Sequence, residues 1–119
     1  MLHHVTFEVR PGDREATAAF YELLGFRRAE PPASLRDRAL WLERGDTQIH
    51  LMRVDEPVTL RRGHAAVIAP EYEQTIERLR AAGHEPEPRE EHWGSPRAFV
   101  RDPADNLVEV MAFPPGGSG

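Results

Sequence analysis

Hydrophobic and polar residues alternate at the start of the chain. Residues 2–9 place Leu2, His4, Thr6 and Glu8 on one face, and His3, Val5, Phe7 and Val9 on the other. This is the period of a half-buried β-strand. The period then becomes helical, and we expect Asp13 to cap a helix that runs to about Leu24 and is stopped by Gly25. Its apolar side is formed by Ala16, Phe20, Leu23 and Leu24.

The same order of signals recurs in the second half of the chain. The segment His4-Val5-Thr6-Phe7 aligns with His64-Ala65-Ala66-Val67, and residues 38–52 align with residues 97–111. The second helix is expected to open at Pro70, to bury Tyr72, Ile76 and Leu79, and to end at Gly83. The remaining expected strands are 26–30, 38–44, 47–54, 64–69, 84–90, 97–101 and 107–113.

These elements predict an α+β fold built from an internal repeat. The two repeats, 1–53 and 64–113, are each a βαβββ module, and residues 54–63 are the linker between them. Together they are expected to form one domain over residues 1–113, with a curved, mostly antiparallel sheet and a polar concave cleft. Residues 114–119 are expected to be a flexible tail.

Four potential metal ligands fall at repeat-related positions. His4 and His64 each start the first strand of a repeat, whereas His50 and Glu109 each lie in its last strand. Alternation places His50 on one face with Gln48 and Met52. Three imidazoles and one carboxylate that converge are a suitable site for a divalent ion, although an isolated strand histidine is more often a packing or surface residue.

Composition narrows the chemistry further. All 15 basic residues are arginine, and cysteine is absent, so lysine and thiolate chemistry are excluded. The net charge of −5 argues against nucleic acid and anionic membranes as partners. No apolar run is long enough to span a membrane and the N-terminus is unlike a signal peptide, so we expect a cytoplasmic protein.

Several segments resemble the vicinal oxygen chelate superfamily. They include LHHVTFEV, YELLGF, GHAAVIAP and WGSPRAFVRDPADNLVEVM, and the resemblance covers about residues 2–113. The most specific segment, RDPADNLVEV, is similar to the ending D-P-x-G-N-x-[IL]-E-[LIV] of that superfamily, except that Asp105 replaces its glycine. The resemblance implies the glyoxalase/bleomycin-resistance fold.

The resemblance also implies a ligand set and a range of activities. His4, His64 and Glu109 fall where metal-binding members have their ligands, and His50 falls where glyoxalase I has Glu and methylmalonyl-CoA epimerase has Gln. We therefore expect a metalloenzyme of isomerase, lyase or dioxygenase type. A divalent ion (Zn, Fe, Mn, Ni or Co) would act as Lewis acid, and Glu109 or His50 would move a proton.

Other functions remain open from the sequence. One alternative is a metal-independent drug- or metabolite-binding protein of the bleomycin-binding type, and another is a fosfomycin-type transferase. We expect a small-molecule substrate, contacted by residues that include Thr6, Arg38, Arg97 and Trp93. Arg38 and Arg97 align in the repeat and are candidates for binding an anionic group. The sheet edges favour a homodimer, with the metal site formed within one chain or at the dimer interface.

Overall fold

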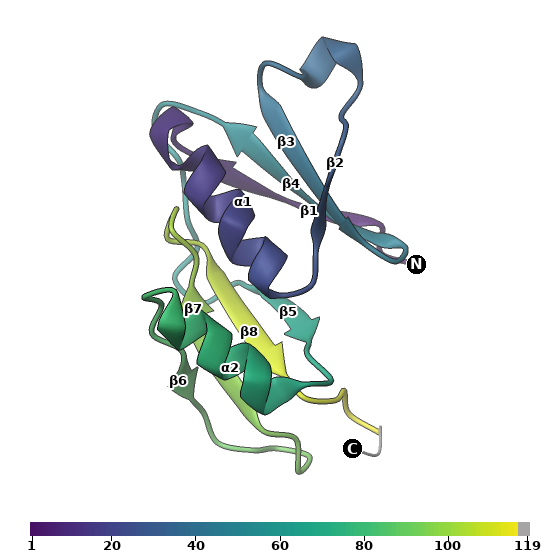
Figure 1. Cartoon of the computed structure of the whole chain (residues 1–119), viewed down its shortest axis with the longest axis vertical. Helices are drawn as coiled ribbons and strands as arrows, with labels where there is room; N and C mark the ends of the chain where they lie inside the picture. Colours follow the sequence, from purple (N-terminus) through teal and green to yellow (C-terminus); the bar gives the residue numbers. More distant parts are fainter. Residues whose placement is uncertain (117–119) are drawn as a thin grey trace. The chain divides into compact units, whose positions relative to one another are not determined.

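A computed structural model describes residues 1–116 of the chain, which divides into two compact units (Figure 1). Unit 1 is Met1–Thr59, and unit 2 begins at Leu60. The elements of unit 1 are β1 (His4–Val9), α1 (Arg14–Leu23), β2 (Arg27–Ala29), β3 (Ala39–Arg44) and β4 (Thr47–Arg53), with short 3-10 turns at Pro11–Asp13 and Ala33–Leu35. Those of unit 2 are β5 (Ala65–Ile68), α2 (Tyr72–Ala81), β6 (Glu87–Pro88), β7 (Arg97–Arg101) and β8 (Leu107–Met111).

The two units have the same sheet topology. The strand orders are β1-β4-β3-β2 and β5-β8-β7-β6. In each sheet the first strand pairs in parallel with the last, and the other neighbours are antiparallel. The predicted α+β fold with two βαβββ modules is therefore confirmed. Within residues 1–116, neither helix is long and apolar enough to cross a bilayer.

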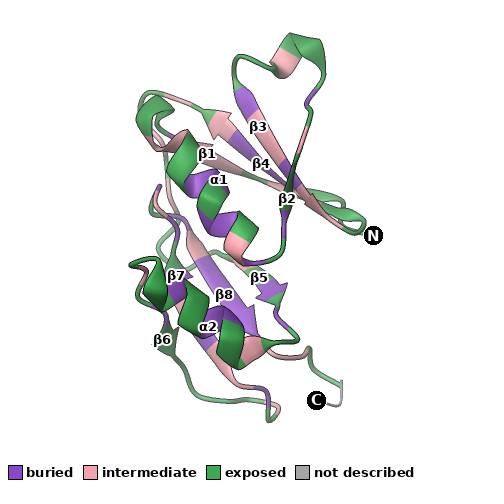
Figure 2. Ribbon diagram, viewed as in Figure 1, coloured by how far each residue is buried: buried purple, intermediate pink, exposed green. Residues whose placement is uncertain are grey.

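The core of unit 1 lies between α1 and one face of its sheet. Phe20 and Tyr21 on α1 and Leu42 and Leu51 on the strands are fully buried. The ring of Phe7 stacks on that of Tyr21, with centroids 6.0 Å apart. Figure 2 shows buried residues on α1 alternating with exposed ones, which is the pattern of a helix with a single apolar side. Each fully buried large side chain contributes about 1.5–3 kcal/mol to folding.

Unit 2 repeats this arrangement with smaller side chains. Leu79 of α2 and Val108 and Val110 of β8 are fully buried, and Ile76 and Val67 are nearly so. In both units the strands therefore present one apolar face to the helix. The opposite face carries the polar residues on which the functional argument depends.

Three sequence expectations about elements need correction. Asp13 occupies the N-cap position of α1, but its side chain makes no capping hydrogen bond. The second helix begins at Tyr72 and not at Pro70. The strand expected at 84–90 is reduced to Glu87–Pro88, because Pro86 and Pro88 lack the N–H groups that a longer ladder needs. Of the predicted tail 114–119, residues 114–116 are exposed, and residues 117–119 lie outside the described part of the chain.

The turn between β7 and β8 is held by a buried carboxylate. Asp102 Oδ1 accepts hydrogen bonds from the backbone N–H groups of Ala104 and Asn106, both at 2.9 Å. The amide of Asn106 donates to the same carboxylate, at 3.2 Å from Oδ2. Asp105 is the one non-glycine residue with positive φ in residues 1–116, at 72°. It stands where the superfamily motif has glycine.

We predict that Asp105→Gly stabilises the protein by about 0.5–1 kcal/mol, because glycine adopts positive φ without a Cβ clash. The exposed contact of Asp105 with Arg101, at 3.9 Å, contributes little. Urea unfolding measures the change, and Asp105→Ala is the matched control. Ala removes the same carboxylate but keeps a Cβ, so it should be less stable than Gly. Equal stability of the two variants would contradict the backbone explanation.

Candidate functional site

The parallel pairing of the first and last strands puts the predicted ligands at equivalent positions in the two sheets. In unit 1, Thr6 is directly opposite His50, so His4 lies two residues before this pair. In unit 2, Ala66 is directly opposite Glu109, and His64 lies two residues before it. Residues two apart on a strand share a face, so each histidine is the diagonal neighbour of a second potential ligand.

The neighbouring antiparallel strand adds an aromatic side chain at the same position of each sheet. Trp41 of β3 is opposite His50, and Phe99 of β7 is opposite Glu109. All of these residues lie on the sheet face away from the helix. The repeat therefore includes the aromatic neighbours of the potential ligands as well as the ligands. The alignment of the two repeats in the sequence did not predict this.

In unit 1 the three rings form a stack. The ring centroids of Trp41 and His50 are 4.0 Å apart with an interplanar angle of 4°, and those of His50 and His4 are 4.0 Å apart at 19°. One edge of the stack is hydrogen-bonded, with His50 Nε2 at 2.7 Å from Gln48 Oε1 and His4 Nδ1 at 2.9 Å from His3 Nδ1. Within residues 1–116, His4 Nε2 and His50 Nδ1 have no hydrogen-bond partner, so both nitrogens could bind a metal ion.

His50 is held neutral in this stack. Its residue surface is 8% exposed. Burial, together with the smaller effects of the charges of His4 and His3, lowers the pKa of His50 to about 4. A neutral imidazole is the form that binds metals.

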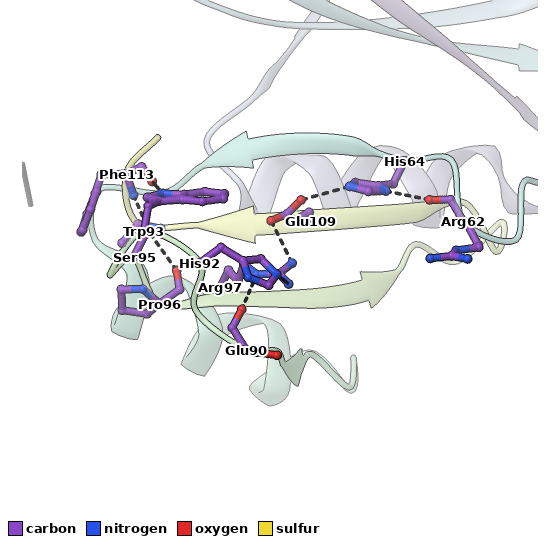
Figure 3. A network of polar contacts seen from close by, with 11 residues as sticks. Arg62, His64, Glu90, His92, Trp93, Ser95, Pro96, Arg97, Glu109 and Phe113 are labelled. Atoms are coloured by element: carbon purple, nitrogen blue, oxygen red, sulfur yellow. Dashed lines mark hydrogen bonds and ion pairs between the residues drawn. The ribbon is translucent and has the colours of Figure 1, made fainter. Parts of the chain in front are cut away.

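In unit 2 a buried carboxylate is the centre of a polar network (Figure 3). Glu109 Oε1 lies 3.0 Å from His64 Nε2, and Glu109 Oε2 accepts a hydrogen bond from Arg97 Nη1 at 3.2 Å. The side chain of Glu109 is 9% exposed and that of Arg97 is 12% exposed. Because a carboxylate is seldom buried without a partner, this pairing accounts for how Glu109 is tolerated there.

The guanidinium of Arg97 is engaged on all sides. Its Nε donates to the carbonyl of Glu90 at 2.7 Å, and its Nη2 donates to His92 Nε2 at 3.0 Å. Its central carbon also lies 5.5 Å from the centroid of the Phe99 ring. The sequence suggested Arg97 as a site for an anionic substrate group. That role stays a prediction, and its contacts also make Arg97 the residue that holds Glu109 in position.

The predicted substrate contact Trp93 belongs to a loop that is fastened to the end of β8. The Trp93 indole N–H donates to the carbonyl of Phe113 at 2.8 Å. Ser95, which is 1% exposed, accepts hydrogen bonds from the backbone N–H groups of Ala112 and Phe113 at 3.1 and 3.0 Å. Sequence reasoning missed Ser95, because a serine in a Gly-Ser-Pro segment is typical of any turn.

The other two predicted contacts lie in unit 1. Thr6 is exposed on the same sheet face as His50. Arg38 is also exposed, but the structure does not support its alignment with Arg97. Arg97 is opposite Met111, whereas the residue opposite Met52 is Ala39. The two-residue turn between β3 and β4 and the five-residue turn between β7 and β8 shift the register of the hairpins by one residue.

Each unit by itself supplies only a pair of ligands. Within residues 1–116, neither unit gathers three or more His, Cys, Asp or Glu side chains that could hold a metal ion. The pair in unit 2 nevertheless fits one. The 3.0 Å between His64 Nε2 and Glu109 Oε1 allows both atoms to bond the same ion at about 2.0–2.2 Å. Arg97 on the other oxygen would then orient the carboxylate, as hydrogen-bond partners of metal ligands do.

Comparison with known proteins identifies the family. A family model described as a glyoxalase-like domain matches residues 4–111. The chain belongs to this family. Among solved structures, a putative glyoxalase family protein from Bacillus anthracis is 26% identical, with a TM-score of 0.84 over 93% of each chain.

Two more distant structures share the fold of this glyoxalase-like domain. Lactoylglutathione lyase from Agrobacterium tumefaciens is 20% identical, with a TM-score of 0.67 over 93% of this chain and 92% of that one. A bleomycin resistance determinant encoded on the transposon Tn5 is 21% identical, with a TM-score of 0.63 over 90% of this chain and 94% of that one. A search of curated proteins gives no match. The predicted vicinal oxygen chelate superfamily and its glyoxalase/bleomycin-resistance fold are confirmed.

We predict that the glyoxalase-like domain loses stability in acid through His50. The native pKa of about 4 lies below the ordinary value of 6.5, so the unfolded chain takes up a proton that the native state excludes. The stabilisation is complete above about pH 6.5 and is lost as the pH falls toward 4. Urea unfolding of chelator-treated protein at several pH values measures it. His50→Gln should flatten this part of the profile, and His84→Gln should not; a profile that His50→Gln leaves unchanged would contradict the assignment.

We also predict that Arg97→Met destabilises the metal-free protein by about 3–5 kcal/mol, because it leaves the Glu109 carboxylate buried without a cation. Arg89→Met is the matched control. The ion pair of Arg89 with Glu87, at 3.0 Å, is exposed and should contribute at most about 1 kcal/mol. The double variant Arg97→Met/Glu109→Gln should recover much of the loss. Additive effects of the two substitutions would show that the pair is not coupled.

Proposed function

We propose that this glyoxalase-like domain is a metal-dependent enzyme that acts on a small substrate with two adjacent oxygen atoms. The proposed ligands are His4 and His50 from unit 1 and His64 and Glu109 from unit 2. The observation that carries the proposal is the repeated diagonal placement of a histidine beside a second ligand in both sheets. Unrelated surface residues would have no reason to share that register and that face.

The chemistry of the donors supports the same proposal. Imidazole nitrogen and carboxylate oxygen suit Zn, Fe, Mn, Ni or Co, and the chain has no thiolate to select otherwise. The lowered pKa of His50 keeps its ring unprotonated. Arg97 orients Glu109 through a hydrogen bond to Oε2. Trp41 orients His50 by stacking on its ring.

The proposed division of labour follows from these contacts. When bound, a divalent ion supplies Lewis-acid stabilisation of negative charge on the two substrate oxygens. Glu109 or His50 moves a proton between substrate atoms. Arg97 keeps the charge of Glu109 balanced while it does so, and His92 accepts a hydrogen bond from Arg97. The reaction belongs to the isomerase, lyase or dioxygenase types of the superfamily.

A second candidate function is metal-independent binding of a drug or metabolite. The observation that favours it is that Arg97 already neutralises Glu109 without a metal ion. In such a binder the aromatic residues Trp41, Trp93 and Phe99 would supply the contact surface. The two functions differ in one measurable property, because only the enzyme needs a metal ion for activity or tight ligand binding.

We predict that untagged, chelator-treated protein binds zinc or cobalt saturably and that the ion raises its melting temperature. Isothermal titration measures the binding. His4→Ala and Glu109→Gln should each weaken it at least about tenfold, because each removes a proposed ligand. His84→Ala, which replaces a histidine outside the proposed set, is the matched control. Failure of both ions to bind, or equal binding by His4→Ala and by the wild type, would contradict the metalloenzyme and favour the binder.

The homodimer expected from the sequence also stays a proposal. Each sheet has two edge strands, which are β1 and β2 in unit 1 and β5 and β6 in unit 2. Edge strands are surfaces on which a second chain can add. The ligand set of the proposal is the same whether one chain or two supply it.

A further inference from the structure

A cavity of about 840 Å³ lies entirely within unit 2. Its charged wall consists of four arginines and two glutamates, which are Arg61, Arg62, Arg89, Arg101, Glu85 and Glu87. The wall is therefore positive, although the whole chain has a net charge of −5. A positive cavity with low-dielectric walls concentrates anions from solution.

Two of the four arginines have no carboxylate to neutralise them. Arg89 pairs with Glu87 at 3.0 Å. Arg101 lies 3.9 Å from the carboxylate of Asp105 and also donates to backbone carbonyls. Across residues 1–116, by contrast, neither the guanidinium of Arg61 nor that of Arg62 has an ion-pair or hydrogen-bond partner. The guanidiniums of these two consecutive residues offer N–H donors in planar forks, the geometry that carboxylate and phosphate groups accept.

The backbone that carries these two arginines is fastened to the sheet. Arg101 Nη1 donates to the carbonyl of Leu60 at 3.1 Å, and Arg101 Nη2 donates to that of Arg61 at 3.2 Å. On the other side, the carbonyl of Arg62 lies 2.7 Å from His64 Nδ1. Held from both sides, the segment needs little ordering when a ligand arrives, which favours binding.

The same cavity has an aromatic and apolar part. Phe99 lines it, together with Val100 and Leu107. The edge of the His64 ring contacts Phe99, with centroids 4.9 Å apart at 75°, and the Arg89 guanidinium lies 5.4 Å from the Phe99 centroid. A planar ligand body would therefore find both a ring and a cation beside it.

We propose that this cavity binds a small organic anion, with its acidic group between Arg61 and Arg62 and its planar body against Phe99. His64 lines the cavity and also contacts Glu109, so the anion would lie beside the proposed metal ligands. Its assignment as the substrate class rests on the proposed function, whereas the binding of the anion does not. From the sequence, residues 54–63 were predicted to be a linker, and Arg61 and Arg62 had no predicted role.

Calorimetric titration of the chelator-treated full chain tests the proposal. The probes are phenyl phosphate, benzoate, inorganic phosphate and the uncharged benzyl alcohol. We expect saturable binding of phenyl phosphate or benzoate at concentrations below about 10 mM, weaker binding of inorganic phosphate and none of benzyl alcohol. Whichever aromatic anion binds more tightly identifies the preferred acidic group.

The Arg61→Ser/Arg62→Ser variant should weaken this binding about tenfold or more, the effect of losing charge-assisted hydrogen bonds. Arg78→Ser/Arg80→Ser removes the same charge from exposed positions on α2 and should bind like the wild type. The proposal is overturned if neither aromatic anion binds, or if both variants bind equally well. Inorganic phosphate binding as tightly as phenyl phosphate would overturn the contact with Phe99.

A zinc titration of the same proteins separates this inference from the proposed function. Arg61→Ser/Arg62→Ser should bind zinc like the wild type, which also shows that the variant is folded. Anion binding without zinc binding would support the cavity and contradict the metalloenzyme. Zinc binding without anion binding would support the metalloenzyme and contradict the anion-binding cavity.

Discussion

The parallel pairing of the first and last strand of each unit is the constraint on which the site depends. It fixes Thr6 opposite His50 and Ala66 opposite Glu109. A slip of one residue in either pairing would turn one ligand of the pair toward the helix-covered core. The apolar residues on the other face, such as Leu51 and Val110, prevent that slip, because they would have to leave the core. Core packing thus maintains the geometry of the functional face.

Charge balance then decides what each pair can do. Unit 2 buries a carboxylate and satisfies it with His64 and Arg97, whereas unit 1 buries a neutral imidazole between two rings. The former pair offers an anionic oxygen as a ligand, and the latter pair offers neutral nitrogen lone pairs. A divalent ion would be an additional partner for Glu109 and would leave Arg97 on the second oxygen. The unpaired arginines of the neighbouring cavity extend positive potential to the surroundings of the same carboxylate.

Much of the fold and part of the site could be predicted from the sequence, for reasons that particular residues illustrate. Alternation at 2–9 determined which face of β1 is buried, and the repeat related His4 to His64 and His50 to Glu109. The alignment of Arg38 with Arg97 was wrong, because an alignment of the two sequence segments without a gap ignores the difference in length between the Gly45-Asp46 turn and the 102–106 turn. The predicted length of β6 was wrong because two prolines in the segment 84–90 lack the N–H groups that a longer strand pairing needs.

What the sequence could not supply were interactions between residues that are distant along the chain. Nothing local indicates that Arg101 binds the carbonyls of Leu60 and Arg61, or that Ser95 holds the end of β8. These contacts turn a presumed linker and an ordinary loop into the surroundings of the site. They are properties of the folded unit, since the donors and acceptors lie far apart in sequence.

X-ray absorption spectroscopy of the zinc-loaded full chain tests whether the three histidines and Glu109 bind one ion, because it identifies the ligands of the ion. We predict a first shell of nitrogen and oxygen at about 2.0–2.2 Å, with the outer-shell scattering of three imidazoles. Replacement of Glu109 by Gln should remove one oxygen contribution while the imidazole scattering persists. A shell of oxygen alone, without imidazole scattering, would contradict the assignment of His4, His50 and His64 as ligands.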